Sequence, residues 1–195
     1  MKISSTLRTL AAACAFALAS QAGAAVLQVN ASGILTGATG VNVGGTLYNV
    51  TFADGSCNSV FNGCVQSAFA FDTNANARLA AQSLLDQVFV DGPEGQFDSR
   101  PARTFGCLGT ICSTYVPYIL LPNNVFGFTI AENRGLTTDF VASSNHFRTT
   151  DYGTNIPINF AVFELAPPAD VPEPASIALF GLALAGLAFT RRRKA

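Results

Sequence analysis

The C-terminal end of the chain is the feature that most constrains how this sequence can fold. Residues 175–190 form an uncharged apolar run in which only Ser176 and Thr190 are polar, and four cations follow it directly. As a helix this run would be about 24 Å long, slightly shorter than the roughly 30 Å hydrocarbon core of a bilayer. Arginines that reach the interface and local thinning of the bilayer close that gap. We therefore predict a transmembrane helix over residues 175–190 rather than a buried helix of a soluble core.

The basic end of the chain predicts the orientation of this helix. Its four cations are Arg191, Arg192, Arg193 and Lys194. Lys and Arg residues next to a membrane span stay on the cytoplasmic side. They would act as a membrane stop and would leave the rest of the chain on the other side of the inner membrane.

A short motif precedes the apolar run. Pro172, Glu173 and Pro174 come first, the apolar run follows, and the basic residues end the chain. This arrangement resembles the PEP-CTERM sorting signal of Gram-negative bacteria over residues 172–195. The resemblance implies that exosortase, a membrane protease-transpeptidase, recognises the motif as its substrate and cuts the tail near it. It further implies transient anchoring in the inner membrane, followed by delivery to the cell surface or the extracellular matrix.

The N-terminal end has the features of a secretory signal peptide. Lys2 and Arg8 precede a short apolar segment at residues 10–19, and an A-x-A cleavage site follows that segment. We predict export through the Sec translocon and cleavage by signal peptidase between Ala24 and Ala25.

Removing both ends leaves one domain at residues 25–166, and a proline-rich, extended stalk at residues 167–171 joins it to the tail. This body has ten acidic and five basic residues, hence a net charge of −5, and it contains no lysine. An acidic surface argues against nucleic acid as a partner, because nucleic-acid binding needs positive charge.

The body contains four cysteines, which are Cys57, Cys64, Cys107 and Cys112. An even number of cysteines in an exported chain predicts two disulfides. Of the three possible pairings we favour the local one, Cys57 with Cys64 and Cys107 with Cys112, which closes the smallest loops. A crossed pairing that joins the two halves of the domain stays open. The spacings C-x6-C and C-x4-C do not fit a zinc site.

Most of the body reads as short strands separated by turn residues. Residues 47–52 alternate between two faces, as a half-buried strand does, and follow a turn at Gly44-Gly45. The other predicted strands lie at residues 115–121, 125–131, 137–142 and 158–165. We predict a mainly β domain, either β-sandwich-like or an antiparallel sheet, with an α+β arrangement as the alternative.

One segment has helical rather than strand periodicity. Over residues 75–90, Leu84 with Val88 and Leu85 with Phe89 have the i, i+4 spacing of an amphipathic helix. Candidates for its N-cap lie directly before it at residues 72–74, and Gly-Pro follows it. We predict a single helix packed across the sheet.

Three groups of residues have the types that catalysis or metal binding needs. His146, the only histidine, lies near Ser143, Ser144 and Asp139 in the sequence. Because members of a triad meet in space and no G-x-S-x-G motif is present, we interpret His146 as a loop histidine.

The other two groups are rich in carboxylates. The segment from Asp72 to Asn76 has the D-x-N-x-N pattern of a calcium loop but lacks its Gly and its final Glu, so helix capping explains it equally well. Asp91, Glu94 and Asp98 follow the predicted helix, with Arg100 and Arg103 close enough in sequence to pair with them.

These patterns predict a non-enzymatic surface or matrix protein without a catalytic residue, metal or cofactor, for which exopolysaccharide is a candidate partner. One alternative is a secreted polysaccharide hydrolase that uses the carboxylates of residues 91–98. Another is a carbohydrate-binding module with exposed aromatic side chains. The candidates for those side chains are Tyr48, Tyr115, Tyr118 and Tyr152.

Overall fold

The computed structural model describes residues 24–153 and 156–167. The predicted signal peptide, apart from its last residue Ala24, and the predicted transmembrane helix lie outside these residues. Among the described residues, no helix combines the length and the hydropathy that a membrane span requires.

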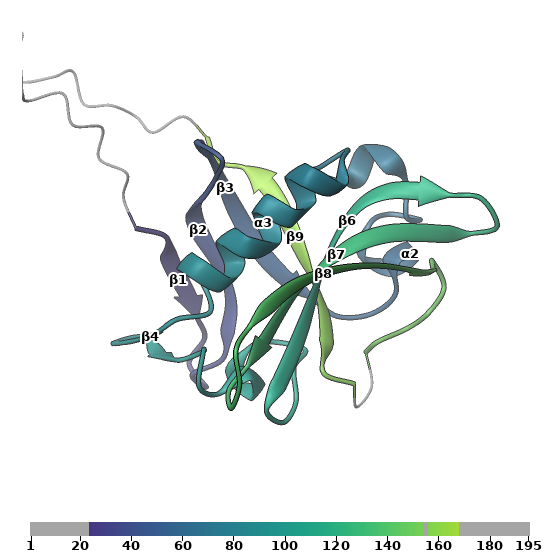
Figure 1. The fold of residues 1–195 in the computed structure, drawn as a ribbon. Coiled ribbons are helices and arrows are strands. Elements are labelled where there is room, and N and C mark those ends of the chain that lie inside the picture. Colours follow the sequence, from purple (N-terminus) through teal and green to yellow (C-terminus); the bar gives the residue numbers. More distant parts are fainter. Residues whose placement is uncertain (1–23, 154–155, 168–195) are drawn as a thin grey trace, which may run out of the picture. The chain divides into compact units, whose positions relative to one another are not determined.

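The described chain folds into a seven-stranded sheet with the order β1-β2-β3-β9-β6-β7-β8 (Figure 1). Its neighbouring strands are antiparallel except for β6 and β9, which are parallel. The strands are β1 (Val26–Val29), β2 (Leu35–Val43), β3 (Thr46–Ala53), β6 (Ile111–Leu121), β7 (Val125–Arg134), β8 (Phe140–Phe147) and β9 (Ile158–Leu165).

The remaining elements are short, apart from one helix. They are the helices α2 (Cys57–Val60) and α3 (Asn74–Gln87), the 3-10 turns η2 (Gln66–Ala68) and η3 (Pro101–Arg103), and a ribbon of β4 (Asp91–Gly92) and β5 (Gly95–Gln96). The mainly β class is therefore confirmed. In the described part, a single mixed sheet takes the place of a two-sheet sandwich or a purely antiparallel sheet.

The hairpin of β2 and β3 turns at the glycines that the sequence indicated. Gly44 and Gly45 have φ angles of +58° and +94°, which glycine adopts without strain, and they join the paired residues Val43 and Thr46. The sequence did not predict β2, in which glycines interrupt the apolar pattern. A side chain at Gly37 would collide with the carbonyl oxygen of Val50 on the neighbouring strand, so close strand packing explains this glycine.

Helix α3 begins where the capping residues predicted it. The side chain of Thr73 accepts a hydrogen bond from the backbone N–H of Asn76 at 3.2 Å. The helix ends at Gln87, three residues before the predicted end, and the backbone N–H groups of Val88 and Phe89 both donate to the Leu84 carbonyl. Both of these side chains are nevertheless buried, because the chain turns toward the sheet after the helix.

One face of the sheet forms a hydrophobic core with α3, which packs on β2, β6, β7 and β8 (Figure 1). Ala77, Ala80, Ala81 and Leu84 are fully buried on the helix, as its periodicity predicted. The small alanines let the helix approach closely, and the hydroxyl of Thr129 on β7 donates a 2.8 Å hydrogen bond to the Ala77 carbonyl.

The other face carries a second, aromatic core. Its buried members are Cys57, Phe61, Cys64, Phe69, Tyr115, Phe126, Phe128, Tyr152 and Phe160. Strand β9 serves both cores by alternation, since Phe160 belongs to the aromatic core and Ala161 and Phe163 to the helical one. The sheet is thus buried on both faces along its centre.

Both cysteine pairs form disulfides in the local arrangement. The Cα atoms are 5.1 Å apart for Cys57 and Cys64 and 5.2 Å apart for Cys107 and Cys112. The first pair lies within the aromatic core, where Cys57 and Cys64 are fully buried. The second closes the loop that leads into β6.

Replacing Cys57 and Cys64 together by serine should lower the free energy of unfolding by about 2–3 kcal/mol, because the unfolded chain regains the freedom of the closed loop. Urea unfolding at pH 7 measures this change. Peptide mapping without reductant is the control, and a link between Cys57 and either Cys107 or Cys112 would contradict the local pairing.

Candidate functional site

His146 lies on an aromatic cluster rather than in a catalytic group. It occupies the edge strand β8, opposite Phe126 of β7. Its ring is nearly parallel to that of Phe128, at a centroid distance of 5.6 Å, and lies 5.9 Å from that of Tyr152. The interpretation of His146 as a loop histidine is therefore wrong in its location, because the residue lies in a strand, where its ring packs on aromatic side chains.

The serines next to His146 do not complete a triad. The Ser143 hydroxyl accepts hydrogen bonds from the side chain of Asn74 at 2.9 Å and of Arg78 at 3.4 Å, on the α3 side of the sheet. Neighbouring residues of a strand point to opposite faces, so His146 lies with Ser144 on the other side. In the described residues no hydrogen bond joins His146 to Ser143, Ser144 or Asp139.

The segment resembling a calcium loop is a helix cap. Thr73 caps α3, and Asn74 donates to Ser143. Within residues 24–153 and 156–167, no three side chains of His, Cys, Asp or Glu gather as metal ligands.

The carboxylates after α3 do not act together. Asp91 Oδ1 accepts the backbone N–H groups of Asp98 and Ser99, each at 3.1 Å, and so holds the base of the β4–β5 ribbon. Slight burial raises the pKa of Asp91, but these hydrogen bonds and Arg100 outweigh it and bring the pKa below its usual value. Asp91 is thus a structural loop residue.

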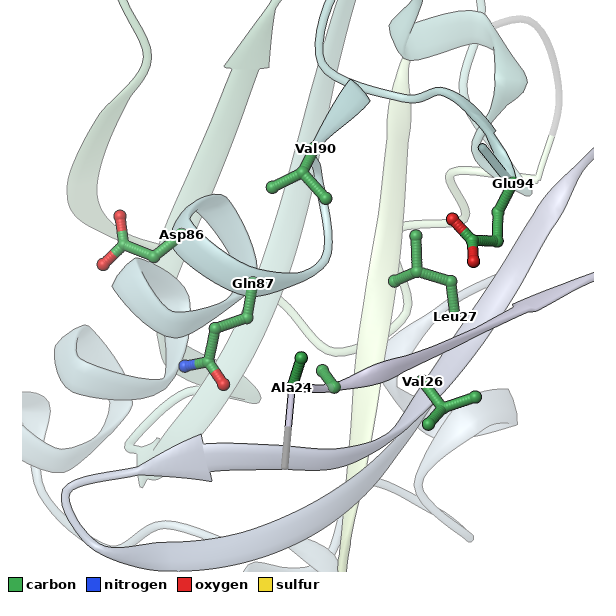
Figure 2. A pocket seen from close by; sticks show the side chains of 8 residues that line it. Ala24, Val26, Leu27, Asp86, Gln87, Val90 and Glu94 are labelled. Atoms are coloured by element: carbon green, nitrogen blue, oxygen red, sulfur yellow. The ribbon is translucent and has the colours of Figure 1, made fainter. Parts of the chain in front are cut away.

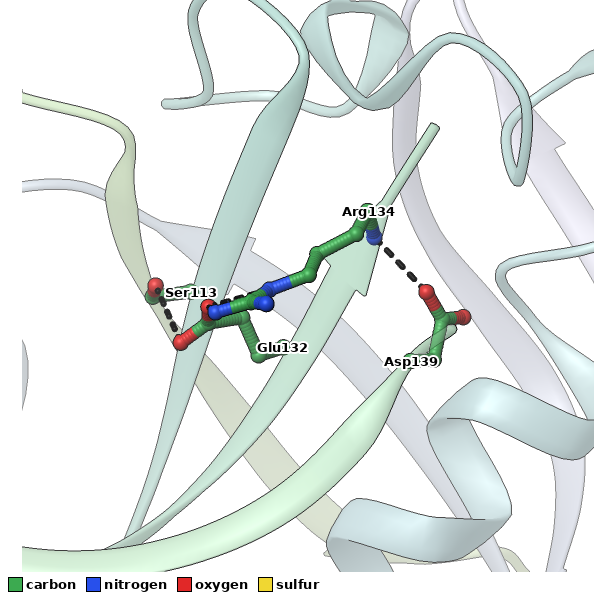
Figure 3. A network of polar contacts seen from close by, with 4 residues as sticks. All are labelled: Ser113, Glu132, Arg134 and Asp139. Atoms are coloured by element: carbon green, nitrogen blue, oxygen red, sulfur yellow. Dashed lines mark hydrogen bonds and ion pairs between the residues drawn. The ribbon is translucent and has the colours of Figure 1, made fainter. Parts of the chain in front are cut away.

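The structure instead gathers polar groups at the far end of β7 (Figure 3). Arg134 Nε donates to Glu132 Oε1 at 2.7 Å, and the Ser113 hydroxyl donates to the other Glu132 oxygen at 3.4 Å. The guanidinium carbon of Arg134 lies 4.5 Å from the centre of the Phe140 ring. This ion pair is the only one among the described residues, so neither Arg100 nor Arg103 forms the predicted pair.

An open cleft of about 530 Å³ adjoins this group. Its lining is Asp98, Ser99, Arg134, Gly135, Leu136, Thr137 and Thr138. The Asp139 carboxylate accepts the backbone N–H of Arg134 at 2.7 Å. Partial burial raises the pKa of Asp139, and the nearby charge of Asp98 raises it further against the opposing effect of Arg134. The cleft therefore combines Arg134, the hydroxyl groups of Ser99, Thr137 and Thr138, and the Asp98 carboxylate, and Asp139 follows the last lining residue in the sequence.

The sequence reasoning missed this group. Glu132 and Arg134 are two residues apart on one strand and so share a face, which is a pattern that a search for same-face opposite charges would find. The contribution of Asp98 comes from a distant loop, and no sequence spacing indicates it.

The four tyrosines do not form an exposed binding platform. Tyr115 and Tyr152 are only 4% exposed and belong to the aromatic core. Burial raises the pKa of Tyr152 to about 12. Tyr48 is half-buried against Phe71, with 5.4 Å between the ring centres.

The residues at the predicted signal cleavage site line another cleft. Ala24 and Ala25 lie at the start of β1, beside the end of α3 (Figure 2). The motif Pro172, Glu173 and Pro174 and the basic residues Arg191 to Lys194 lie outside the described residues.

Replacing Asp98 by asparagine should lower the pKa of Asp139, because it removes the neighbouring negative charge. With the pKa of Asp139 raised in the folded state, its ionisation reduces stability as the pH rises from 3.8 through the raised value. Asp98→Asn should therefore reduce the stability that is lost when Asp139 ionises. An NMR titration of the Asp139 carboxyl carbon tests this, with Asp151→Asn as the matched control. An unchanged titration of Asp139 would contradict the proximity of the two carboxylates.

Comparison with known proteins gives one match, in the tail. Residues 170–194 match the family model described as the PEP-CTERM protein-sorting motif, which covers the motif, the apolar run and the basic end. No curated protein and no solved structure matches the chain. The resemblance of the tail is therefore confirmed independently of the body. The chain carries a PEP-CTERM sorting motif, which marks it as an exported protein targeted to exosortase.

Proposed function

We propose that residues 25–166 form a non-enzymatic structural or interaction domain of the cell surface or extracellular matrix. After Sec export, signal peptidase cuts between Ala24 and Ala25 and so removes the signal peptide. Exosortase then removes the tail near Pro172, Glu173 and Pro174. The matched sorting motif supports the delivery. The contacts of the candidate catalytic residues support the non-enzymatic role.

Those contacts are structural in each case. His146 stacks on Phe128, Thr73 caps α3, and Asp91 holds a loop through two backbone N–H groups. A nucleophile or general base needs a hydrogen-bonded partner in the reaction path. Thr73 and Asp91 accept hydrogen bonds from the backbone, and His146 packs its ring against an aromatic side chain, which favours a role in holding the fold.

The chemistry of the body also suits an extracellular location. Disulfides persist in oxidising compartments, and both cysteine pairs of the body are bridged. Its net charge of −5 keeps the released domain soluble and away from anionic surfaces.

One observation favours a second candidate function, a polysaccharide hydrolase or binding module. The cleft beside Arg134 places Asp98 near Asp139, whose pKa is raised, as the acid of a glycosidase requires. Release of reducing ends from a polysaccharide, abolished by Asp139→Asn, would favour this candidate over the structural one.

Replacing Pro172, Glu173 and Pro174 together by alanine tests the delivery. In a host that contains exosortase, the variant should stay in the membrane fraction with its tail attached, because the enzyme no longer recognises its substrate. Fractionation followed by immunoblotting measures this distribution.

The matched control is Pro168→Ala, which changes the stalk before the residues that the family model matches and should leave delivery unchanged. Equal amounts of the triple variant and the parent protein at the cell surface would overturn the proposed processing.

A further inference from the structure

The cleft at the beginning of β1 is the strongest feature that the proposed function does not use. It has a volume of about 500 Å³ and lies between the N-terminal strand and the end of α3. Its lining is Ala24, Ala25, Val26, Leu27, Asp86, Gln87, Val90 and Glu94. In Figure 2, Asp86 and Gln87 lie on one side of Ala24 and Glu94 on the other.

Both walls of this cleft are anchored to the same strand. On one side β1 pairs with β2, with Val26 opposite Thr39. On the other, the side chain of Gln87 forms two hydrogen bonds with the backbone of Asn42 on β2, accepting at 2.9 Å and donating at 2.8 Å. The position of Ala25 relative to the end of α3 is therefore fixed by the fold.

Two carboxylates and the C-terminal end of α3 place negative charge around the cleft. Asp86 on α3 and Glu94 in the β4–β5 turn are the titratable side chains of its lining. Asp86 accepts a 2.8 Å hydrogen bond from the neutral side chain of Gln82, which leaves its charge in place. The C-terminal end of a helix carries a partial negative charge, and the last turn of α3 contains no basic residue. These groups favour a cation in the cleft.

Signal cleavage would create such a cation at this point. Cleavage between Ala24 and Ala25 converts an amide nitrogen of the cleft lining into an ammonium group. Because residues 25–166 contain no lysine, and the two lysines of the chain are Lys2 and Lys194, this ammonium is the only primary amine of the body after processing.

We propose that the cleft formed by Asp86, Glu94 and the end of α3 is a binding site for the α-ammonium group of Ala25. Cleavage thus supplies the cation that completes the cleft, and the bound ammonium fixes the first residues of the edge strand β1. It also keeps the sole amine of the body protonated and slow to acylate. The inference rests on the proposed cleavage after Ala24.

Acylation of the exported full-length protein with acetic anhydride tests this site. The rate at Ala25 is measured on the N-terminal peptide by mass spectrometry from pH 6 to 10, because the rate follows the unprotonated fraction of the amine. An ordinary α-amine has a pKa of about 7.7–8.0. The pKa of Ala25 should lie above that range, and the variant with Asp86→Asn and Glu94→Gln should react about threefold faster at pH 7.

The control is Asp72→Asn, which removes one negative charge at the opposite end of α3, about 20 Å away, and should leave the rate unchanged. Salt of 1 M should raise the rate of the unmodified protein, independently of any variant. If the acylation rate at Ala25 is the same in the parent protein and the double variant and does not respond to salt, this inference is overturned while the proposed cleavage still holds. If the exported protein begins at a residue other than Ala25, both the inference and the proposed cleavage are overturned.

Discussion

The structure depends on the insertion of β9 between β3 and β6. This strand pairs antiparallel with β3 over six residue pairs and parallel with β6 over three, and so joins the two halves of the sheet. Its alternation also links the two cores, with Phe160 on the aromatic face and Ala161 and Phe163 on the helical face. Because β9 is the last strand of the body, the sheet can close only after the chain has extended to Leu165.

The position of β9 at the end of the body brings the last-formed part of the sheet close to the tail in the sequence. The stalk follows β9 in the sequence and the sorting motif follows the stalk, so only a few residues separate the end of the central strand from the matched motif. Long-range pairing of this kind is slow compared with local helix formation. The local disulfides do not replace it, because each closes a short loop within one region and leaves the two halves of the sheet to be joined by β9.

The elements that are predicted best from the sequence are those whose pattern of polar and apolar residues agrees with their burial in the fold. Residues 158–165 are mostly apolar and form β9 with the predicted bounds, and the capping residue Thr73 marks the beginning of α3. Strand β8 extends beyond its predicted end, to Phe147, because its polar residues occupy an exposed edge and read as a loop. Of the candidate sites, local spacing suggested Asp91 and Glu94, but the proximity of Asp98 to Asp139 arises from the fold and has no local signal.

The central claim is that both ends are removed to leave the disulfide-bonded body at the cell surface. The mass of the intact protein recovered from the surface of the producing cell tests this claim most directly. The account predicts a chain that begins at Ala25 and ends near Pro174, and a mass lower by two hydrogens for each of the two disulfides. A surface form that still contains Arg191 to Ala195 would contradict it.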